Sequence, residues 1–281
     1  SSDLLSYQGN YSEVFRGDDT INELGNLKHV SESGKPSNLA LMHRRLSILD
    51  VSELGHQPLV ADSGRYAIIF NGEVYNYKEI RQDLISQGYQ FKSNSDTEVV
   101  LNSFIEWGEK CVERFVGMWA YAIHDKQENV LSLSRDRYGI KPLYFYQRGS
   151  YFAFASEIKA IIAHPKYERG INLHALNEYF TFQNLFTFQT LFKDVLMLPP
   201  ANTVRVDRNS KFIKHHSWWD YDFSQPDEKM SFMDAKEETE RLFKQAVARQ
   251  MVADVPVGSY LSGGMDSGSI TAIASQHVPR L

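Results

Sequence analysis

The sequence predicts an α+β fold in which layers of antiparallel strands pack against helices. Stretches with a strand pattern are followed by stretches with a helix pattern, which is typical of this class. Consecutive strand-like stretches are joined by short polar turns, as antiparallel hairpins are. Between residues 118 and 156 we therefore expect a β meander, with strands at 118–125, 130–134, 143–146 and 151–154.

The composition indicates a globular protein of about two domains. The chain has 281 residues, of which 42% are apolar, so it can bury a sizeable core. Its net charge of -5 gives no sign of a nucleic-acid partner. The single cysteine, Cys111, excludes a disulfide within the chain and fits a reducing compartment. Since neither a membrane-spanning run nor a signal-peptide pattern is found, we expect a cytoplasmic protein without a membrane partner.

The first clear element after the irregular residues 1–37 is a strand at 39–50, which carries Arg44 and Arg45. Neighbouring residues on a strand face opposite sides. One of these arginines can therefore point into a pocket, or both can lie in solvent at a strand edge. The strand alone does not decide between the two.

Residues 66–77 contain an apolar strand pattern that stops at Asn71-Gly72 and is followed directly by Glu73. An Asn-Gly pair between apolar runs is the strongest short-range signal for a type I′ hairpin turn, and from this stretch alone the hairpin is the favoured interpretation. The alternative is an oxyanion site. In that case the Asn71 amide and the Gly72 N–H face the charge that develops on a tetrahedral adduct.

Two helices are expected next. The first spans 77–88, with Ile85 on its apolar face and Gly88 as its stop. Residues 95–98 match a capping box, which begins the second helix and places Asp96 in its first turn. A carboxylate is favoured there by the helix dipole. Asp96 then either stabilises the helix end or anchors a ligand ammonium group.

The middle of the chain offers mostly structural signals. Cys111 lies among apolar residues of a helical piece and is interpreted as a small core residue rather than a nucleophile. The charged residues 135–142 are expected to form a salt-bridged turn. Short helices are expected at 157–164 and 172–180, the second capped by Asn172.

Residues 222–231 are polar and contain proline, so we expect a linker between a first domain at 1–221 and a second that begins at 232. A helix follows, and then an apolar strand at 255–261 leads into a glycine-rich loop and another helix. One strand with one helix cannot bury a core of its own. Residues 232–281 are therefore expected to be the incomplete beginning of the second domain.

The glycine-rich loop has the arrangement that binds phosphates, between a strand and a helix. Gly263 and Gly264 allow backbone N–H groups to approach a ligand at the positive helix N-terminus. Ser262 and Ser267 supply hydroxyls, and Asp266 can bind a Mg²⁺ shared with phosphate oxygens. The string is neither a Walker A loop nor a dinucleotide motif. A plain Gly-Gly turn is the alternative to a nucleotide site, and the specific string favours the nucleotide.

Several strings together resemble the family of glutamine-hydrolysing asparagine synthetases. Residues 262–267, preceded by 254–258, are similar to the pyrophosphatase loop of that family. Other strings resemble the glutaminase domain of the family and occur in the order that the family has. They lie earlier in the sequence, at 43–48, 55–58, 70–76, 95–98, 135–144 and 155–160.

The resemblance implies an N-terminal-nucleophile, class II glutamine amidotransferase domain with four αββα layers, followed by the start of an α/β ATP-pyrophosphatase-type domain. It implies a ligase that uses glutamine, ATP and Mg²⁺. The acceptor carboxylate attacks ATP to form an acyl-adenylate, and ammonia from glutamine travels through a tunnel to displace AMP. Aspartate is the expected acceptor, with a surface-sugar or peptide carboxylate as the alternative. The resemblance also allows for a homodimer.

Site roles are carried over from the family position by position. Asn71 and Gly72 would form the oxyanion hole, and Arg45 would bind the glutamine α-carboxylate through its bidentate fork. Asp96 would hold the α-ammonium group. The remaining pocket residues would be Ile48, Leu49 and Glu73. The ATP site would consist of Leu261 at adenine, Asp266 at Mg²⁺, and Ser262, Gly263, Gly264 and Ser267 at pyrophosphate.

The sequence departs from the family in two places. The family begins with Cys-Gly-Ile, whose thiol attacks glutamine and whose α-amino group is the base, whereas this sequence begins Ser1-Ser2. An Arg-Gly-Pro-Asp loop is expected shortly before His43, where residues 28–31 stand instead. Segments absent from the sequence are the favoured explanation. A degenerate domain that only binds glutamine or a partner, and Ser1 as the nucleophile, are the alternatives.

Overall fold

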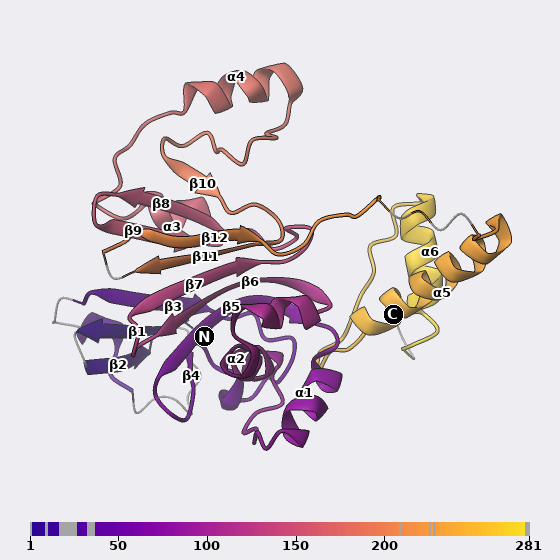
Figure 1. Cartoon of the computed structure of the whole chain (residues 1–281), viewed down its shortest axis with the longest axis horizontal. Coiled ribbons are helices and arrows are strands. Elements are labelled where there is room, and N and C mark those ends of the chain that lie inside the picture. The colour runs from indigo at the N-terminus through magenta and orange to yellow at the C-terminus, as the bar shows by residue number, and fades with distance from the viewer. Residues whose placement is uncertain are drawn as a thin grey trace.

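The computed structural model describes residues 2–8, 11–16, 27–32, 37–207, 209–224, 226 and 229–278. Ser1 lies outside the described residues. The centre of the structure is a six-stranded sheet in the order β12-β11-β7-β6-β5-β4 (Figure 1), and each neighbouring pair is antiparallel. Its strands are β4 (Leu59–Val60), β5 (Tyr66–Val74), β6 (Gly117–Asp125), β7 (Val130–Arg135), β11 (Asn202–Asp207) and β12 (Phe212–Ser217).

Two three-stranded sheets cover one face of this central sheet, in the orders β2-β1-β3 and β10-β8-β9. Their strands are β1 (Ser2–Gln8), β2 (Tyr11–Arg16), β3 (Leu39–Arg44), β8 (Tyr144–Arg148), β9 (Tyr151–Ala155) and β10 (Val195–Met197). All three sheets share one apolar core, to which Leu5, Leu41, Ala122, Leu133 and Leu143 contribute. The strands β1 and β2 were not predicted, because their sequence is short and polar.

Helices close the outer faces. The helices α1 (Tyr77–Ser86) and α2 (Asp96–Trp107), with the short η4 (Gly108–Arg114), pack on the central sheet around Leu84, Val100 and Trp119. On the other side α3 (Ile158–Ile162) packs on β8 and β9. The layers are therefore helix, sheet, sheet and helix, which confirms the predicted αββα class. The helix α4 (Leu173–Phe182) lies beyond β10 at the edge of the body (Figure 1).

A C-terminal unit made of α5 (Phe232–Gln250) and α6 (Met265–Ala274) lies to one side of this body (Figure 1). The two helices contact each other. The strand predicted at 255–261 is wrong, because these residues pair with no strand in the described part of the chain. An isolated extended segment has no neighbour to accept its ladder of hydrogen bonds. None of the described helices has both the length and the apolarity that crossing a membrane requires.

The hairpin interpretation of Asn71-Gly72 is also wrong. Both residues lie inside β5 and pair with Ala120 and Trp119 of β6. Glycine is required at this position for another reason, since a Cβ on Gly72 would lie 2.2 Å from the Met118 carbonyl oxygen. The Asn-Gly pair therefore marks the close approach of two strands rather than a turn.

The expected single meander is divided between two sheets, because the turn after β7 carries the chain from one to the other. This turn is held by charged side chains that bond backbone groups, where salt bridges were expected. The Arg135 guanidinium donates to the carbonyls of Gly139, Lys141 and Leu198. The Asp136 carboxylate accepts the N–H groups of Trp119, Tyr138, Ile140 and Lys141.

The predicted capping box is formed only in part. The Ser95 hydroxyl accepts the Thr97 N–H at 3.0 Å and caps α2. The Glu98 carboxylate, however, binds the N–H groups of residues 92–93 instead of that of Ser95. Ile85, which was expected on the apolar face of α1, is 45% exposed, since the helix packs through Ile80 and Leu84.

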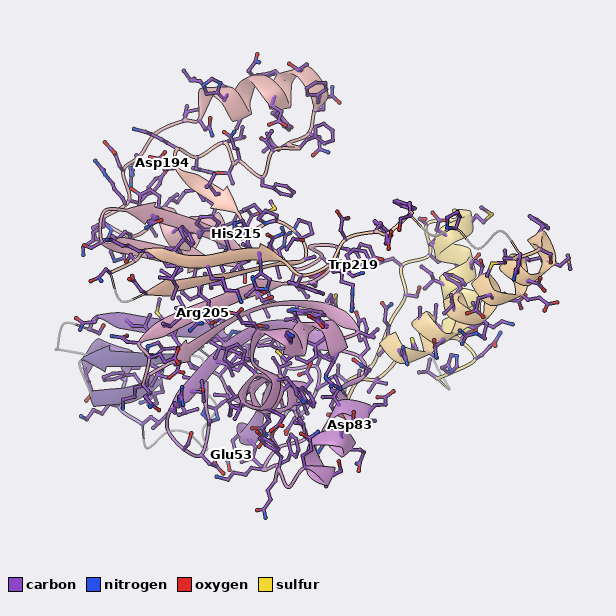
Figure 2. The ribbon with its side chains drawn as sticks, viewed as in Figure 1. Glu53, Asp83, Asp194, Arg205, His215 and Trp219 are labelled. Carbon is purple, nitrogen blue, oxygen red and sulfur yellow. The ribbon has the colours of Figure 1, made fainter. Side chains whose placement is uncertain are left out.

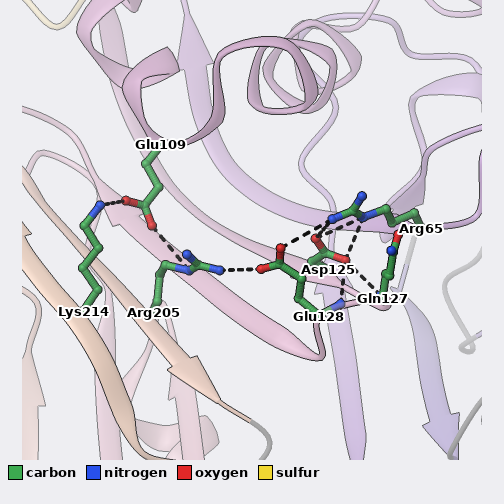
Figure 3. A network of polar contacts seen from close by, with 7 residues as sticks. All are labelled: Arg65, Glu109, Asp125, Gln127, Glu128, Arg205 and Lys214. Carbon is green, nitrogen blue, oxygen red and sulfur yellow. Dashed lines mark hydrogen bonds and ion pairs between the residues drawn. The ribbon is translucent and has the colours of Figure 1, made fainter.

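A chain of ion pairs crosses the central sheet from β5 to β12 (Figure 3). Arg65 binds Asp125 at 2.6 Å, and Arg205 approaches Glu109 to 3.5 Å. Glu109 also pairs with Lys214, and Glu128 on the β6–β7 turn joins the two arginines. Two of its carboxylates, those of Asp125 and Glu109, are largely covered, whereas Glu128 and Lys214 are about half exposed. The network therefore links the strands from β5 to β12 across the sheet.

We expect Asp136→Ala to destabilise the protein strongly. Asp136 is completely buried, and its removal leaves several buried backbone donors without an acceptor, each at a cost of about 1–3 kcal/mol. The free energy of unfolding, measured by urea denaturation and tryptophan fluorescence, should fall by roughly 3–5 kcal/mol. The control Asp207→Ala removes similar backbone bonds at an exposed turn and should shift the midpoint far less. Equal shifts would contradict the role given to Asp136.

Candidate functional site

Arg45 lies one residue beyond the end of β3 and is half-buried, whereas Arg44 is exposed. The Nη2 atom of Arg45 donates to the Leu49 carbonyl at 2.6 Å and to the Asp50 carbonyl at 2.5 Å. Its Nη1 atom lies 3.4 Å from the Ser52 carbonyl. Of the two alternatives that the sequence left open, the structure has one arginine partly buried and its neighbour exposed.

Residues 48–52, which we call the strap, wrap around this guanidinium. A Cβ on Gly55 would lie 2.4 Å from Arg45 Nη2, so only glycine leaves room for the fork at this point. The Asp50 carboxylate accepts the Asn94 N–H at 2.7 Å. The strap is thereby tied to the turn that precedes α2.

Asp96 begins α2 and is 5% exposed. Its Oδ2 atom accepts the Val74 N–H at 3.0 Å, so the carboxylate joins the helix start to the end of β5. Burial raises the pKa of Asp96 to about 7; the nearby Glu73 adds to this rise and the Arg45 charge opposes it. The predicted position in the first turn is confirmed.

Asn71 and Glu73 point to the second strand layer. Their neighbours Ile68 and Phe70 pack with the helices, and alternate residues of a strand face opposite sides. The Asn71 Nδ2 atom donates to the Ser156 hydroxyl at 3.1 Å, which links β5 to the chain that follows β9. Burial raises the pKa of Glu73 above its ordinary value, and a nearby lysine opposes this shift.

Gln57 fixes β5 against the start of α2. Its Oε1 atom accepts the Phe70 N–H at 2.6 Å, and its Nε2 atom donates to the Thr97 hydroxyl at 3.2 Å. Both bonds are buried, and they hold Phe70, which precedes Asn71, and Thr97, which follows Asp96. Because Phe70 and Thr97 have fixed places in the fold, the positions of Asn71 and Asp96 relative to each other are fixed as well.

The beginning of β1 lies beside the end of β3, next to Arg45. Ser2 is the register partner of Arg44, which is next to Arg45. Burial, with a smaller effect of the Arg45 charge, lowers the pKa of His43 to about 4. His43 is therefore neutral at ordinary pH and adds no further positive charge beside Arg45.

The charges of Arg45 and Glu73 both act on Asp96, so these three side chains lie near one another, and Asn71 lies two residues before Glu73 on the same side of β5. The predicted pocket carbonyls are already bonded within the protein: the Leu49 oxygen holds Arg45, and the Ile48 oxygen accepts the Asp254 N–H at 3.0 Å. The supports of the site that were not predicted from the sequence are Asp50, Gln57 and Ser156. Gln57 and Ser156 lie inside family-like strings, which was the one signal that could have identified them.

The predicted ATP residues lie apart from this group, in the C-terminal unit. Gly264 is the N-cap of α6, and no side chain caps the helix start. The Ser262 and Ser267 hydroxyls are 2.9 Å apart, and Ser267 donates to the Gly264 carbonyl at 3.1 Å. Leu261 and Asp266 are exposed, as is Gly263. Within the described ranges no three His, Cys, Asp or Glu residues form a ready metal cluster.

A cavity of about 780 Å³ lies between α3 and residues 167–192, and none of the predicted site residues lines it. Figure 2 labels Asp194 on this side of the molecule and Glu53, which follows the strap, on the far side of the body. The two places are separated by the sheets. The cavity is therefore a feature of the α3–α4 region and does not belong to the candidate site.

The αββα fold of the chain is similar to that of a solved amidotransferase. The structure is similar to that of glutamine phosphoribosylpyrophosphate amidotransferase from B. subtilis, with a TM-score of 0.52, 16% identity and coverage of 98% of this chain and 58% of that chain. Residues 28–219 match the family described as "Glutamine amidotransferase domain", and residues 238–281 match "Asparagine synthase". The chain belongs to the glutamine amidotransferase domain family.

Relatives with named activities cover most of the chain. "Asparagine synthetase [glutamine-hydrolyzing] 3" of Bacillus subtilis is 40% identical over 84% of this chain and 38% of the relative. "Putative asparagine synthetase [glutamine-hydrolyzing] 2" of Methanocaldococcus jannaschii is 34% identical over 85% of this chain and 48% of the relative. The chain spans less than half the length of these relatives. The family resemblance predicted from the motifs is confirmed.

Cys111 should resist alkylation in the native protein. Its side chain is completely buried, and burial raises the pKa of the thiol to about 12, so almost no reactive thiolate exists. Intact mass after treatment with iodoacetamide at about pH 8 should show no adduct, and the same treatment in denaturant should add one group. Rapid labelling of the native chain would contradict the core position and reopen a nucleophilic role.

Proposed function

We propose that the chain is part of a glutamine-dependent, ATP-driven ligase that forms an amide through an acyl-adenylate, with aspartate as acceptor and asparagine as product. The observation that carries this proposal is the proximity of Arg45, Glu73 and Asp96, with Asn71 two residues before Glu73 on the same side of β5. A cationic fork, a carboxylate and an amide donor in one place match the three polar groups of glutamine. The family membership and the named relatives support the same activity.

Arg45 would bind the α-carboxylate. Its Nη2 atom is engaged by the strap, while a guanidinium has five N–H donors in a fixed plane. The remaining donors can therefore receive a carboxylate as a fork. Asp96 would hold the α-ammonium group once ionised, and the strap residues Ile48 and Leu49 would border the ligand.

Asn71 and Gly72 would stabilise the oxyanion. The central position in β5 and the bond to Ser156 fix the Asn71 amide before any ligand binds, and such preorganised donors are the most effective at a developing charge. The cysteine of the chain, Cys111, is buried elsewhere and would not be the attacking group.

The second site would bind ATP with Mg²⁺. The uncapped start of α6 fits a phosphate group, because helix N-termini offer free N–H groups and positive potential. Ser262, Gly263, Gly264 and Ser267 would contact pyrophosphate, Leu261 would contact adenine, and Asp266 would supply the single carboxylate that Mg²⁺ commonly takes beside phosphates. Bound ATP would activate the acceptor carboxylate. We assign residues 1–221 to the first domain, 222–231 to the linker and 232–281 to the second domain.

The decisive assay uses the complete protein with aspartate, ATP and glutamine. The appearance of asparagine with AMP supports the proposal, and another carboxylate as the sole acceptor would redirect it to a sugar or peptide substrate. ATP consumption that aspartate does not change would contradict the aspartate assignment. Ammonia in place of glutamine should also support synthesis, because the second site does not need the first for its chemistry.

A glutamine-binding domain without turnover is the second candidate. It is favoured by the internal bonding of the site, since the Asn71 amide already donates to Ser156 and Arg45 to the strap. Calorimetry would then show glutamine binding to the complete protein while ammonia release stays absent. Turnover of glutamine would exclude this candidate.

Glutamine binding should depend on pH through Asp96. Its pKa of about 7 means that the carboxyl is largely protonated below this pH in the free protein, and only the ionised form pairs with an ammonium group. Affinity should therefore fall as pH drops below about 7, by up to about tenfold per pH unit, and stay level above it. Calorimetry in two buffers at about pH 6 should show proton release. Asp96→Asn should bind weakly at every pH, and an unchanged pH profile would refute the assignment.

Asn71→Ala should lower glutamine hydrolysis of the complete protein by about 100-fold or more, as removal of one oxyanion donor does in other enzymes. The matched variant Ser156→Ala removes only the partner of the Asn71 amide and should cost much less. Steady-state ammonia release measures both variants. Ammonia-driven synthesis should survive Asn71→Ala, and unchanged glutamine turnover would remove Asn71 from the mechanism.

A further inference from the structure

The segment between α5 and the phosphate-type loop returns to the amidotransferase body before it reaches that loop. Val252 packs against the core cluster that includes α1 and α2, and Asp254 follows two residues later. Figure 1 shows the chain from the C-terminal unit meeting the body beside α1. From there residues 255–261 lead into 262–267. The chain is therefore held against the amidotransferase body at Val252 and Asp254, shortly before the loop at 262–267.

Asp254 makes two hydrogen bonds with the strap. Its Oδ2 atom accepts the Asp50 N–H at 2.7 Å, and its own N–H donates to the Ile48 carbonyl at 3.0 Å. The Leu49 and Asp50 carbonyls of the same strap hold Arg45 Nη2 at 2.6 and 2.5 Å. The backbone of the strap is therefore bonded both to Asp254 and to the Arg45 guanidinium.

The bond from the Asp50 N–H to a carboxylate is charge-assisted and stronger than a neutral bond. It fixes the orientation of the peptide groups whose carbonyls point at Arg45. A bidentate fork recognises a carboxylate only within narrow limits of distance and angle. If the strap could move, the Arg45 guanidinium would move with it. Among the described residues, Asp254 itself is bonded neither to Arg45 nor to any other proposed pocket side chain.

We propose that Asp254 is a positioning residue that sets the strap, and through it Arg45, and that couples the loop at 262–267 to the glutamine pocket. This inference rests on the function proposed above for the two sites. When the loop orders around ATP and Mg²⁺, the segment that begins at Asp254 becomes more constrained, and the strap is held in one arrangement. By thermodynamic linkage, bound glutamine then raises the affinity of the loop for the nucleotide by the same factor as the nucleotide raises the affinity for glutamine.

The first test measures glutamine affinity of the full chain by calorimetry. Asp254→Ala should weaken binding by about tenfold, the lower end of what loss of one hydrogen bond to a charged group gives. Asp254→Asn should stay within about threefold of the parent protein, because its amide oxygen still accepts the Asp50 N–H. The control Asp222→Ala removes an exposed carboxylate that bonds its own turn and should change nothing. Equal loss in Asp254→Asn and Asp254→Ala would contradict the positioning role.

The second test repeats the titration with and without ATP and Mg²⁺. Glutamine affinity of the parent protein should rise with nucleotide, and this rise should disappear in Asp254→Ala. A structural defect alone would weaken both titrations equally and leave the ratio unchanged. The same affinity and the same nucleotide response in the parent protein and in Asp254→Ala would overturn the proposal.

Hydrogen exchange separates this inference from the proposed function. The Asp50 amide should exchange faster in Asp254→Ala than in the parent protein without any ligand, while amides in the middle of β6 should not change. If the parent chain binds no glutamine but this acceleration is seen, the proposed function fails and the hold of Asp254 on the strap is supported. If the Asp50 amide exchanges at the same rate in Asp254→Ala and in the parent protein, the inference is overturned, whether or not the chain binds glutamine.

Discussion

The half-buried guanidinium of Arg45 is the constraint on which the site depends. An arginine keeps its charge at any ordinary pH, so its N–H groups need acceptors wherever water is excluded. The strap supplies the carbonyls of Leu49 and Asp50, and Gly55 provides the space that a side chain would fill. The path of residues 48–52 is therefore shaped by the charge that it encloses.

The strand β5 provides the second fixed part of the site. Asn71 and Glu73 alternate with residues that pack on the helices, while Gly72 lets β6 approach closely. Gln57 then bonds the backbone of this strand at its middle, and Asp96 bonds it at its end. Asn71, Glu73 and Asp96 consequently lie on a strand and at a helix start, while Arg45, just beyond β3, is held by the strap. Such fixed positions give the precision that recognition of a small polar ligand needs.

Features with a strong local signal were predicted well. The β6–β7 and β8–β9 hairpins, the α1 and α2 helices and the Asn172 cap of α4 are present, because turn residues, helical period and cap hydroxyl or amide groups act over a few residues. The hairpin at Asn71-Gly72 failed for the same reason. Its local signal was genuine, but pairing with β6 along the whole strand outweighed it.

The sequence by itself determined the class of the fold, the burial of Cys111, the family and the residue types of both proposed sites, since each is expressed in patterning or in a short contiguous string. Only the tertiary structure decided which of Arg44 and Arg45 turns inward, that Asp136 organises a turn through backbone bonds, and that Asp254 holds the strap. The bond between Asp254 and Asp50 joins segments 204 residues apart, and Asp136 also bonds Trp119 of the neighbouring strand. The partners of these residues depend on how sheets and helices pack, and no local spacing of residues records that.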